Sequence, residues 1–294
     1  MNIVTLTLSP AADIEYRAAR FGEGLNRVSS HAVSAGGKGI NVSRSITASA
    51  RRSGDPVPFR LRTVAPLGGA AGEMIRWILA GEGIGVTAVK IAGDTRVNAS
   101  LIPDEGGSIE VNAPGTPVGD ALGEIEAAAL AGIGPGDVLV IAGSCPRDVP
   151  KSYPSELVSK AKARGAAAVL DCDGEALKIA VRAETKPDLI KPNREELISL
   201  TGLREDASAE ELGRAAQALG IPRVITTMAG DGSLLTSEGK SVFFPTEKRK
   251  VVRLKGAGDT FLGAFVYAHC VLGKSAEDAM EYASAAAGAY VAGE

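Results

Sequence analysis

The sequence predicts one α/β domain whose central sheet is mostly parallel, with helices on both faces and a small antiparallel β flap (lid) beside it. Strand-like and helix-like segments alternate along most of the 294 residues, which is typical of a parallel sheet joined by helices. Residues 138–142 (Val-Leu-Val-Ile-Ala) form a continuous apolar run, as expected of a strand buried on both faces. No repeat, low-complexity tract or long linker divides the chain, so we predict a single domain over residues 1–294.

The main elements follow from hydrophobic periodicity and turn residues. Strands are expected at residues 3–8, 61–66, 138–142, 168–170, 189–190 and 224–227. Helices are expected at residues 73–80, 151–164, 194–200, 208–219, 259–272 and 276–291. Ligands of such sheets bind beyond the carboxyl ends of the strands. Polar residues are expected there after several strands: Asp13, residues 143–144, Asp171, residues 191–193 and residues 227–232.

Four short polar segments do not fit a buried parallel sheet. They cover residues 14–20, 27–33, 97–102 and 108–111, and the last two flank Asp104-Glu105-Gly106-Gly107, a hairpin signal. We interpret them as the antiparallel lid, with strands at about 14–33 and 97–111. Periodicity alone leaves an ordinary edge hairpin open as the alternative.

Composition excludes several classes of function. A net charge of −3, a pI near 5.7 and the lack of a long basic run argue against nucleic-acid binding. Three cysteines without a C-x-x-C pattern indicate a reducing cytosol, and two histidines are too few for a His-rich metal site. The N-terminus lacks signal-peptide features, and no apolar stretch reaches membrane-spanning length. We therefore expect a soluble cytoplasmic protein without a nucleic-acid or membrane partner.

Residues 255–260 (Lys-Gly-Ala-Gly-Asp-Thr) run directly into an apolar helical pattern. Free N–H groups at the start of a helix, next to the positive end of its dipole, form an anion site, and phosphate is a common occupant. Gly256 and Gly258 allow the backbone to approach a ligand closely. Asp259 could then take a proton from an alcohol beside the phosphate. The alternative is a tight loop with Asp259 as a helix N-cap, and this stretch alone does not choose between the two.

Together with residues 35–44 (Ala-Gly-Gly-Lys-Gly-Ile-Asn-Val-Ser-Arg), this Gly-Ala-Gly-Asp segment resembles the signatures of the PfkB-type, ribokinase-like sugar kinases, and the similarity extends from Thr5 to about Val291. The resemblance implies a ribokinase-like fold and ATP with Mg²⁺ as cofactors. It implies that Asp259 is the catalytic base and that three residues donate N–H groups to the transferring phosphate: Gly256, Ala257 and Gly258. Such base assistance is typically worth about 10²–10⁴-fold in rate.

The resemblance also implies a sugar-phosphate site. Asp13, Gly37 and Asn41 match positions that hold sugar hydroxyls, which suits carboxylate, amide and N–H groups. Further positions match contacts to a phosphate already on the substrate: Lys38, Arg96, Ser144 and, as a further candidate, Arg27. Taken singly, each has an ordinary structural alternative, namely a turn aspartate, a helix-start asparagine or a solvated cation.

On the nucleotide side, residues 191–196 (Lys-Pro-Asn-Arg-Glu-Glu) resemble the Asn-x-x-Glu motif of the family. By that resemblance Asn193 and Glu196 orient Mg²⁺ through its water shell. The alternative is an Asn-capped helix with an acidic first turn. The ATP-binding residues implied by the resemblance are Lys191, Asn193, Thr227, Gly230 and Gly232.

Several positions depart from the family pattern. Ala229 stands where glycine is usual, Lys255 where a small or hydroxylated residue is usual, and residues 145–148 (Cys-Pro-Arg-Asp) replace Leu-Pro-x-Gly. The chain ends at Glu294, before the tail that the family commonly carries, so we expect part of the nucleotide pocket to be incomplete. These departures can alter the handling of the nucleotide or of a monovalent cation, and from the position of Lys255 we hypothesise that its ammonium replaces a bound K⁺.

The expected function is ATP-dependent phosphorylation of a ketohexose phosphate. Lys38 and the pair Asn26-Arg27 resemble the 1-phosphofructokinase and tagatose-6-phosphate kinase branch, which favours conversion of fructose 1-phosphate to fructose 1,6-bisphosphate. Fructose 6-phosphate and tagatose 6-phosphate are the alternative substrates. A non-catalytic module that binds sugar phosphate or nucleotide is the alternative of another class. The resemblance also implies a homodimer formed through the lid.

Overall fold

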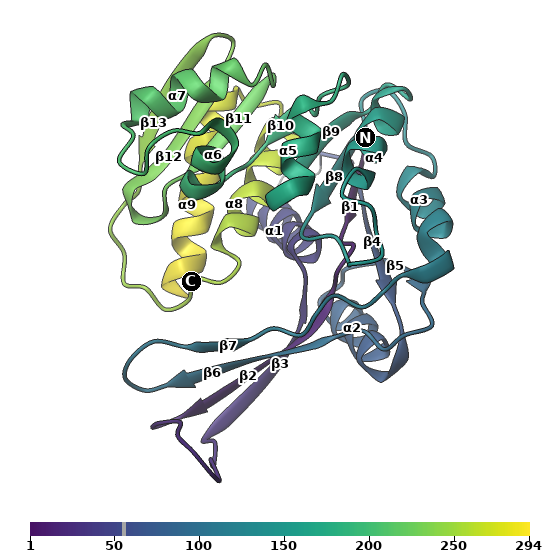
Figure 1. Cartoon of the computed structure of the whole chain (residues 1–294), viewed down its shortest axis with the longest axis vertical. Helices are drawn as coiled ribbons and strands as arrows, with labels where there is room; N and C mark the ends of the chain where they lie inside the picture. The colour runs from purple at the N-terminus through teal and green to yellow at the C-terminus, as the bar shows by residue number, and fades with distance from the viewer. Residues whose placement is uncertain (55–56) are drawn as a thin grey trace.

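The computed structural model describes residues 1–54 and 57–294 and contains a nine-stranded sheet with helices on both faces (Figure 1). The strand order is β13-β12-β11-β10-β9-β8-β1-β4-β5. In chain order these strands are β1 (Asn2–Leu6), β4 (Arg60–Leu67), β5 (Val86–Lys90), β8 (Val138–Ala142), β9 (Ala167–Asp171), β10 (Leu189–Ile190), β11 (Arg223–Thr227), β12 (Gly232–Ser237) and β13 (Lys240–Pro245). The pairs from β5 to β11 are parallel, and β11, β12 and β13 pair antiparallel. The predicted α/β class with a mostly parallel sheet is confirmed.

Helices cover both faces of this sheet (Figure 1). They are α1 (Lys38–Ser53), α2 (Gly69–Gly81), α3 (Leu122–Leu130), α4 (Tyr153–Lys162), α5 (Gly174–Arg182), α6 (Arg194–Thr201), α7 (Ala209–Ala218), α8 (Ala257–Val266) and α9 (Ala276–Ala292). A π-helical turn, Tyr267–Val271, extends α8. Strand β8 shows the principle, because Leu139 and Ile141 join one core while Val138 and Val140 join the other. The continuous apolar run thus forms a strand buried on both faces, as predicted.

The sequence patterns missed some elements of the main sheet. Strand β5, the β12–β13 hairpin and helices α1, α3 and α5 were not predicted from the sequence. Strand β13 is mostly exposed at the sheet edge and carries little apolar alternation. Helix α3 is short and rich in alanine, so its hydrophobic stripe is weak. Their packing on the sheet, rather than their local pattern, determines these elements.

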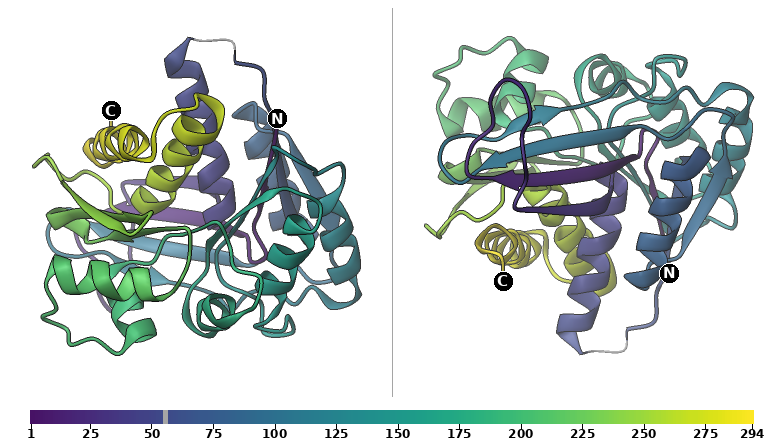
Figure 2. Two further views of the ribbon diagram at one scale, coloured as in Figure 1. Left: turned by 90° about the horizontal axis from the view of Figure 1, so that it is seen from above. Right: turned by 90° about the horizontal axis from the view of Figure 1, so that it is seen from below.

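A separate four-stranded sheet projects from the main body, and we call it the lid (Figures 1 and 2). Its order is β3-β2-β6-β7, with bounds β2 (Ala11–Ala18), β3 (Ser30–Gly36), β6 (Val97–Pro103) and β7 (Ile109–Val111). The four predicted segments are therefore present, but the expectation of an antiparallel sheet was wrong, since β2 and β6 run parallel. Only a tight hairpin forces strands to be antiparallel, and most of the first hundred residues lie between β2 and β6.

The register of the lid separates a polar face from an apolar one. Asp13 lies beside Asn98, and Glu15 beside Ser100, which in turn lies beside Glu110. The other face carries exposed apolar side chains, including Val33, Val97, Ile109 and Val111. In the part of the chain that the structure describes, no helix is long and apolar enough to cross a membrane.

Candidate active site

Charged side chains converge where strands β8, β9 and β10 end and helices α1 and α8 begin. Asp171 is the last residue of β9 and is 2% exposed. Its carboxylate lies 3.2 Å from Lys191 Nζ and 3.6 Å from Lys38 Nζ. Lys191 follows β10, and Lys38 is the first residue of α1. We call these three residues, with Asp259, the central cluster.

Asp259 lies in the first turn of α8 and is 8% exposed. The N-cap position of this helix belongs to Gly256, whose φ of 88° is in the left-handed region that favours glycine. The N-cap alternative for Asp259 is therefore wrong. Its Oδ2 instead accepts a hydrogen bond of 2.8 Å from Asn41 Nδ2 on α1.

The surroundings of Asp259 favour a proton acceptor near neutral pH. Burial raises the pKa of its carboxyl to about 6, with a further contribution from the negative charge of Asp171. The hydrogen bond from Asn41 and the charges of Lys191 and Lys38 oppose that rise. At pH 7 the group is mostly ionised yet binds a proton more readily than a solvated carboxylate, which suits a general base.

Lys38 stays positively charged in this cluster. Burial acts to lower the pKa of Lys38, but the carboxylates of Asp171, Glu196 and Asp259 outweigh it and raise that pKa. Lys191 lies against the start of α8, since a Cβ added to Gly258 would meet its Nζ at 3.4 Å. Two lysine side chains and the N-terminus of α8 therefore lie close to the Asp259 carboxylate.

The loop before α8 is held from behind by α9. Tyr290 Oη donates to the Lys255 carbonyl at 2.7 Å and would lie 2.8 Å from a Cβ on Gly256, so the loop needs glycine there. The N–H of Ala257, expected on the phosphate, donates instead to the Leu254 carbonyl at 3.1 Å. Ala257 can serve a phosphate only if that turn bond opens, whereas nothing comparable engages the N–H groups of Gly256 and Gly258 within residues 1–54 and 57–294.

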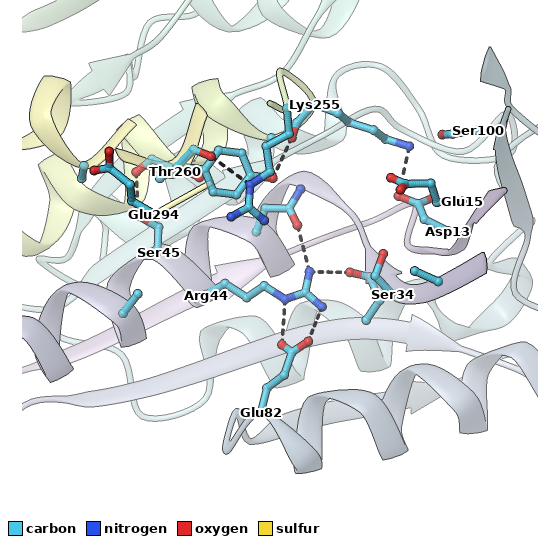
Figure 3. Close-up of a pocket in the computed structure, with 18 of the residues that line it drawn as sticks. Asp13, Glu15, Ser34, Arg44, Ser45, Glu82, Ser100, Lys255, Thr260 and Glu294 are labelled. Atoms are coloured by element: carbon cyan, nitrogen blue, oxygen red, sulfur yellow. Dashed lines mark hydrogen bonds and ion pairs between the residues drawn. The ribbon is translucent and has the colours of Figure 1, made fainter. Parts of the chain in front are cut away.

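A cavity of about 440 Å³ opens between the lid, α1, the 253–256 loop and α9 (Figure 3). Two residues expected to bind sugar hydroxyls, Asp13 and Asn41, line it together with Gly256. Asp13 accepts from Asn98 Nδ2 at 2.8 Å, and a Cβ on Gly36 would collide with its carboxylate at 2.5 Å. The third expected residue, Gly37, precedes α1 with φ 134°. A Cβ on it would strike Thr7, so glycine is required for α1 to begin beside β1.

The expected substrate-phosphate residues have separate partners in this structure. Arg96 donates to the backbone carbonyls of Ser9 and Ala113 at 3.0 and 2.9 Å, which fixes the start of the lid. Lys38 belongs to the central cluster. Ser144 follows β8 and Gly143, and a Cβ added to Gly143 would lie 3.7 Å from Lys38 Cβ. Arg27 is exposed in the β2–β3 connection of the lid.

Lys255 reaches toward the lid. Its ammonium lies 3.2 Å from Asp13 (Figure 3). It also lies 3.6 Å from Glu110 of β7, and the Lys255 side chain is 54% exposed. Glu110 also accepts from Ser100 Oγ at 2.7 Å. The loop before α8 is thus linked to the polar face of the lid by the Lys255 side chain.

On the nucleotide side, Asn193 and Glu196 form a complete capping box at the start of α6. Asn193 Oδ1 accepts from the N–H of Glu196 at 2.7 Å, and Glu196 Oε2 accepts from the N–H of Asn193 at 2.8 Å. The structural alternative for these residues is therefore present, and it leaves Glu196 with a second carboxylate oxygen. Thr227 pairs with Asn193 and donates its N–H to Pro192 at 3.1 Å, which places it beside the motif.

The loop after β11 contains the remaining expected nucleotide residues. Gly230 lies in a short helical turn (Ala229–Asp231), and Gly232 follows with φ 131°. A Cβ on Gly232 would meet the Phe244 carbonyl at 2.3 Å, so glycine is required. Ala229 has φ 47°, a conformation that costs a residue with a Cβ and explains why glycine is usual there.

The residues present suit Mg²⁺ bound mainly through water and phosphate. Within the described residues, no group of three or more His, Cys, Asp and Glu side chains is placed to hold a metal ion. Mg²⁺ in kinases typically uses one or two carboxylates, the phosphates of the nucleotide and several waters. Glu196 lies in the first turn of α6, and its negative charge also acts on Lys38. Its second carboxylate oxygen would supply the one carboxylate ligand that such a Mg²⁺ ion needs.

Sequence reasoning missed three members of the site. Asp171 was placed at the correct edge of the sheet, but no motif indicated that it pairs with two lysines. Arg44 lies inside the motif at 35–44, but the motif does not show that it pairs with Glu82, the residue after α2. Tyr290 lies in a helix of mostly small residues and gave no signal.

Comparison with known proteins identifies the family. The sequence model of the pfkB family carbohydrate kinases matches residues 6–293. The chain is 33% identical over 267 residues to 1-phosphofructokinase of Bacillus subtilis, covering 90% of this chain and 84% of that protein. It is 31% identical over 265 residues to tagatose-6-phosphate kinase of Staphylococcus epidermidis, covering 88% and 82%.

The fold agrees with the same assignment. The structure of Escherichia coli phosphofructokinase-2 in complex with substrates and products superimposes with a TM-score of 0.90 at 28% identity, covering 99% of this chain and 93% of that one. Other structures of that enzyme contain potassium or show a tetrameric inhibited form. With the motifs, the fold and the central cluster in agreement, the chain belongs to the PfkB family of carbohydrate kinases, which phosphorylate sugars with ATP.

Proposed function

We propose that the protein transfers the γ-phosphoryl group of ATP to a hydroxyl of a ketohexose phosphate, with fructose 1-phosphate as substrate and fructose 1,6-bisphosphate as product. The observation that carries this proposal is the hydrogen bond from Asn41 of α1 to the buried Asp259 at the start of α8, beside two lysines and a cavity lined by Asp13. Relatives named for ketose-phosphate substrates support the substrate class.

The chemistry needs positioning and charge neutralisation more than covalent help. The acceptor hydroxyl gives its proton to Asp259 while its oxygen attacks the γ-phosphorus, and the bond to the bridging oxygen of ADP breaks. Lys191, Lys38 and the N–H groups of Gly256 and Gly258 neutralise charge on the group in transfer. Mg²⁺, held near Glu196 and Asn193 through water, supplies further neutralisation of the ATP phosphates when bound.

The remaining site residues divide between the sugar-phosphate side and the nucleotide side. Asp13, Gly37 and Asn41 bind the sugar hydroxyls, while Lys38, Arg96 and Ser144 are our candidates for the substrate's own phosphate. Thr227, Gly230 and Gly232 support the nucleotide. The exposed apolar face of the lid pairs with the same face of a second copy, giving a homodimer.

The test is ADP release with Mg·ATP on fructose 1-phosphate, fructose 6-phosphate, tagatose 6-phosphate and unphosphorylated fructose. Turnover on one phosphorylated ketose is expected, with fructose 1-phosphate giving the highest kcat/KM. Equal turnover of free fructose would contradict the assigned substrate class.

One observation favours a second candidate, a non-catalytic binding module. The Lys255 ammonium contacts Asp13, the group proposed to bind a sugar hydroxyl. If this contact persisted with ligands bound, the sugar could not be seated for transfer. Binding of ATP and sugar phosphate by calorimetry, without ADP release on any of the four sugars, would support this candidate over the kinase.

A further inference from the structure

We infer that Arg44 and Glu82 are positioning residues for phosphoryl transfer, because they hold the Asn41 amide in the orientation that donates a hydrogen bond to Asp259. The inference rests on the proposed role of Asp259 as the base. Neither residue touches Asp259 itself, so both act through Asn41.

The planar guanidinium of Arg44 is held by hydrogen bonds to three residues, Glu82, Ala35 and Asn41 (Figure 3). Its Nε and Nη2 donate to the two carboxylate oxygens of Glu82 at 2.7 and 2.9 Å. Its Nη1 donates to the Ala35 carbonyl at 2.5 Å and to Asn41 Oδ1 at 3.0 Å. Arg44 lies three residues after Asn41 on the same face of α1, and Glu82 directly follows α2, so two helices and the end of β3 hold this fork.

The partners at the two ends of the Asn41 amide leave one orientation. A guanidinium only donates hydrogen bonds, so the atom that faces Arg44 must be the amide oxygen. A carboxylate only accepts, so the atom that faces Asp259 must be the amide nitrogen. Both requirements agree on the observed arrangement, in which the amide still has a second N–H and a second lone pair for a sugar hydroxyl.

The arginine fork is difficult to replace. A lysine at position 44 has one ammonium on a flexible stem and cannot span the Glu82 carboxylate, the Ala35 carbonyl and the Asn41 oxygen in a fixed plane. Side-chain exposures of 27% for Arg44 and 34% for Glu82 mean that their pairing alone adds modest stability. The arrangement is therefore better explained by what it orients than by the ion pair itself.

The hydrogen bond from Asn41 opposes the other forces on Asp259. The groups that act on this carboxylate are Asp171 from β9, Lys191 after β10, and Lys38 and Asn41 from α1, while Tyr290 of α9 lies across the loop. Burial and Asp171 favour the protonated acid. If the amide rotates or loses its partner, the carboxylate loses its direct neutral donor, and it becomes protonated at higher pH.

The experiment measures kcat against pH from 5.5 to 9 for wild type, Arg44→Gln and Arg44→Lys. We expect the acid limb of Arg44→Gln to move to higher pH by about one unit, the size of a lost hydrogen bond to a charged group. For a wild-type limb near pH 6, that shift lowers kcat about fivefold at pH 6 and barely at pH 8.5. Arg44→Lys should shift the limb in the same direction by less.

Arg51→Gln is the matched control. Arg51 is also on α1 and also contacts Glu82, but it donates to the backbone carbonyl at 2.8 Å and not to the carboxylate. Its loss should leave the limb in place. Glu82→Gln, which keeps an acceptor but not the bidentate carboxylate, provides a second variant and should shift the limb in the direction of Arg44→Gln.

A second readout needs no turnover. The ¹³C resonance of the Asp259 carboxyl in the free protein, assigned with Asp259→Asn, reports its titration directly. An upward shift of this titration in Arg44→Gln but not in Arg51→Gln is expected. An unmoved titration in a folded Arg44→Gln, or an equal loss of kcat at every pH, would overturn the inference. Absence of kinase activity in wild type would instead contradict the proposed function and leave this titration to test the positioning.

Discussion

The two sides of Asp259 are built differently. On the inner side, the central cluster and Asn41 are held by short contacts among side chains that are mostly buried. On the lid side, Lys255 and Glu110 are half-exposed and meet at 3.6 Å. Fixed, dehydrated charges have strong and stable effects, whereas exposed charges are screened by water and rearrange easily. The site therefore holds Asp259 in a fixed environment and leaves the lid side adjustable.

This contrast assigns different consequences to the two sides. A change in the buried cluster should alter chemistry and the pH profile, because those groups determine the charge of Asp259. A change at the lid contact should alter sugar binding and leave chemistry nearly intact.

The largest effect is expected from Asp259→Asn. The amide cannot take the proton of the acceptor hydroxyl, so kcat should fall by about 10²–10⁴-fold. The same variant should be more stable above pH 6. The pKa of Asp259 is raised, so its contribution to stability is present below its ordinary value of 3.8 and is lost as pH rises through about 6. Kinetics and thermal unfolding at pH 7.5 test both parts, and a destabilised variant with full activity would contradict them.

Asp171→Asn should move the pH profile in the direction opposite to Arg44→Gln. Asp171 raises the pKa of Asp259, so its neutralisation should lower that pKa and displace the acid limb of kcat toward lower pH. The variant also leaves Lys191, which is 7% exposed, without its carboxylate partner, so we expect a loss of stability as well. A limb that moves upward would show that Asp171 does not act on Asp259 through its charge.

Local sequence patterns predicted the fold class and part of the site, but not the contacts between neighbouring strands. The fold class followed from buried apolar strands, and the motifs located Asp259, Asn41 and Lys191 at one edge of the sheet. The pairing of Asp171 with two lysines could not be predicted, since it depends on which strands lie side by side. The parallel β2–β6 pair of the lid was missed for a similar reason. Local periodicity shows which face of a strand is buried, but not which strand lies next to it.

Lys255→Met tests the adjustable side. The Lys255 ammonium contacts the Asp13 carboxylate, so its removal should free that carboxylate for the sugar and lower the KM for sugar phosphate by a fewfold. The kcat should change by less than about threefold, because exposed ion pairs contribute little. The variant also tests the K⁺ hypothesis. If the ammonium replaces a cation, wild type should be insensitive to K⁺ and the variant should be activated by it.

Glu110→Gln is the matched variant for this contact. It removes the second carboxylate that faces Lys255 without touching Asp13. If the contact restrains the lid, Glu110→Gln should change KM less than Lys255→Met does. A large fall in kcat for either variant would contradict the division between a fixed and an adjustable side. Strong K⁺ activation of wild type would instead contradict the hypothesis that the Lys255 ammonium replaces a cation.

The smallest effect is expected from Ala229→Gly in the nucleotide loop. At φ 47° the Cβ of alanine strains the backbone by about 1 kcal/mol, and glycine removes this strain. Glycine also raises the conformational entropy of the unfolded chain, which offsets part of the gain, so the free energy of unfolding should rise only slightly. Glu238→Gly is the control, because Glu238 has φ 51° in the turn between β12 and β13. Both variants should gain similar stability in denaturant unfolding. Only Ala229→Gly should also change the KM for ATP, because its loop follows β11 beside Thr227 and Asn193. Equal effects of both variants on that KM would show that this loop has no special part in nucleotide binding.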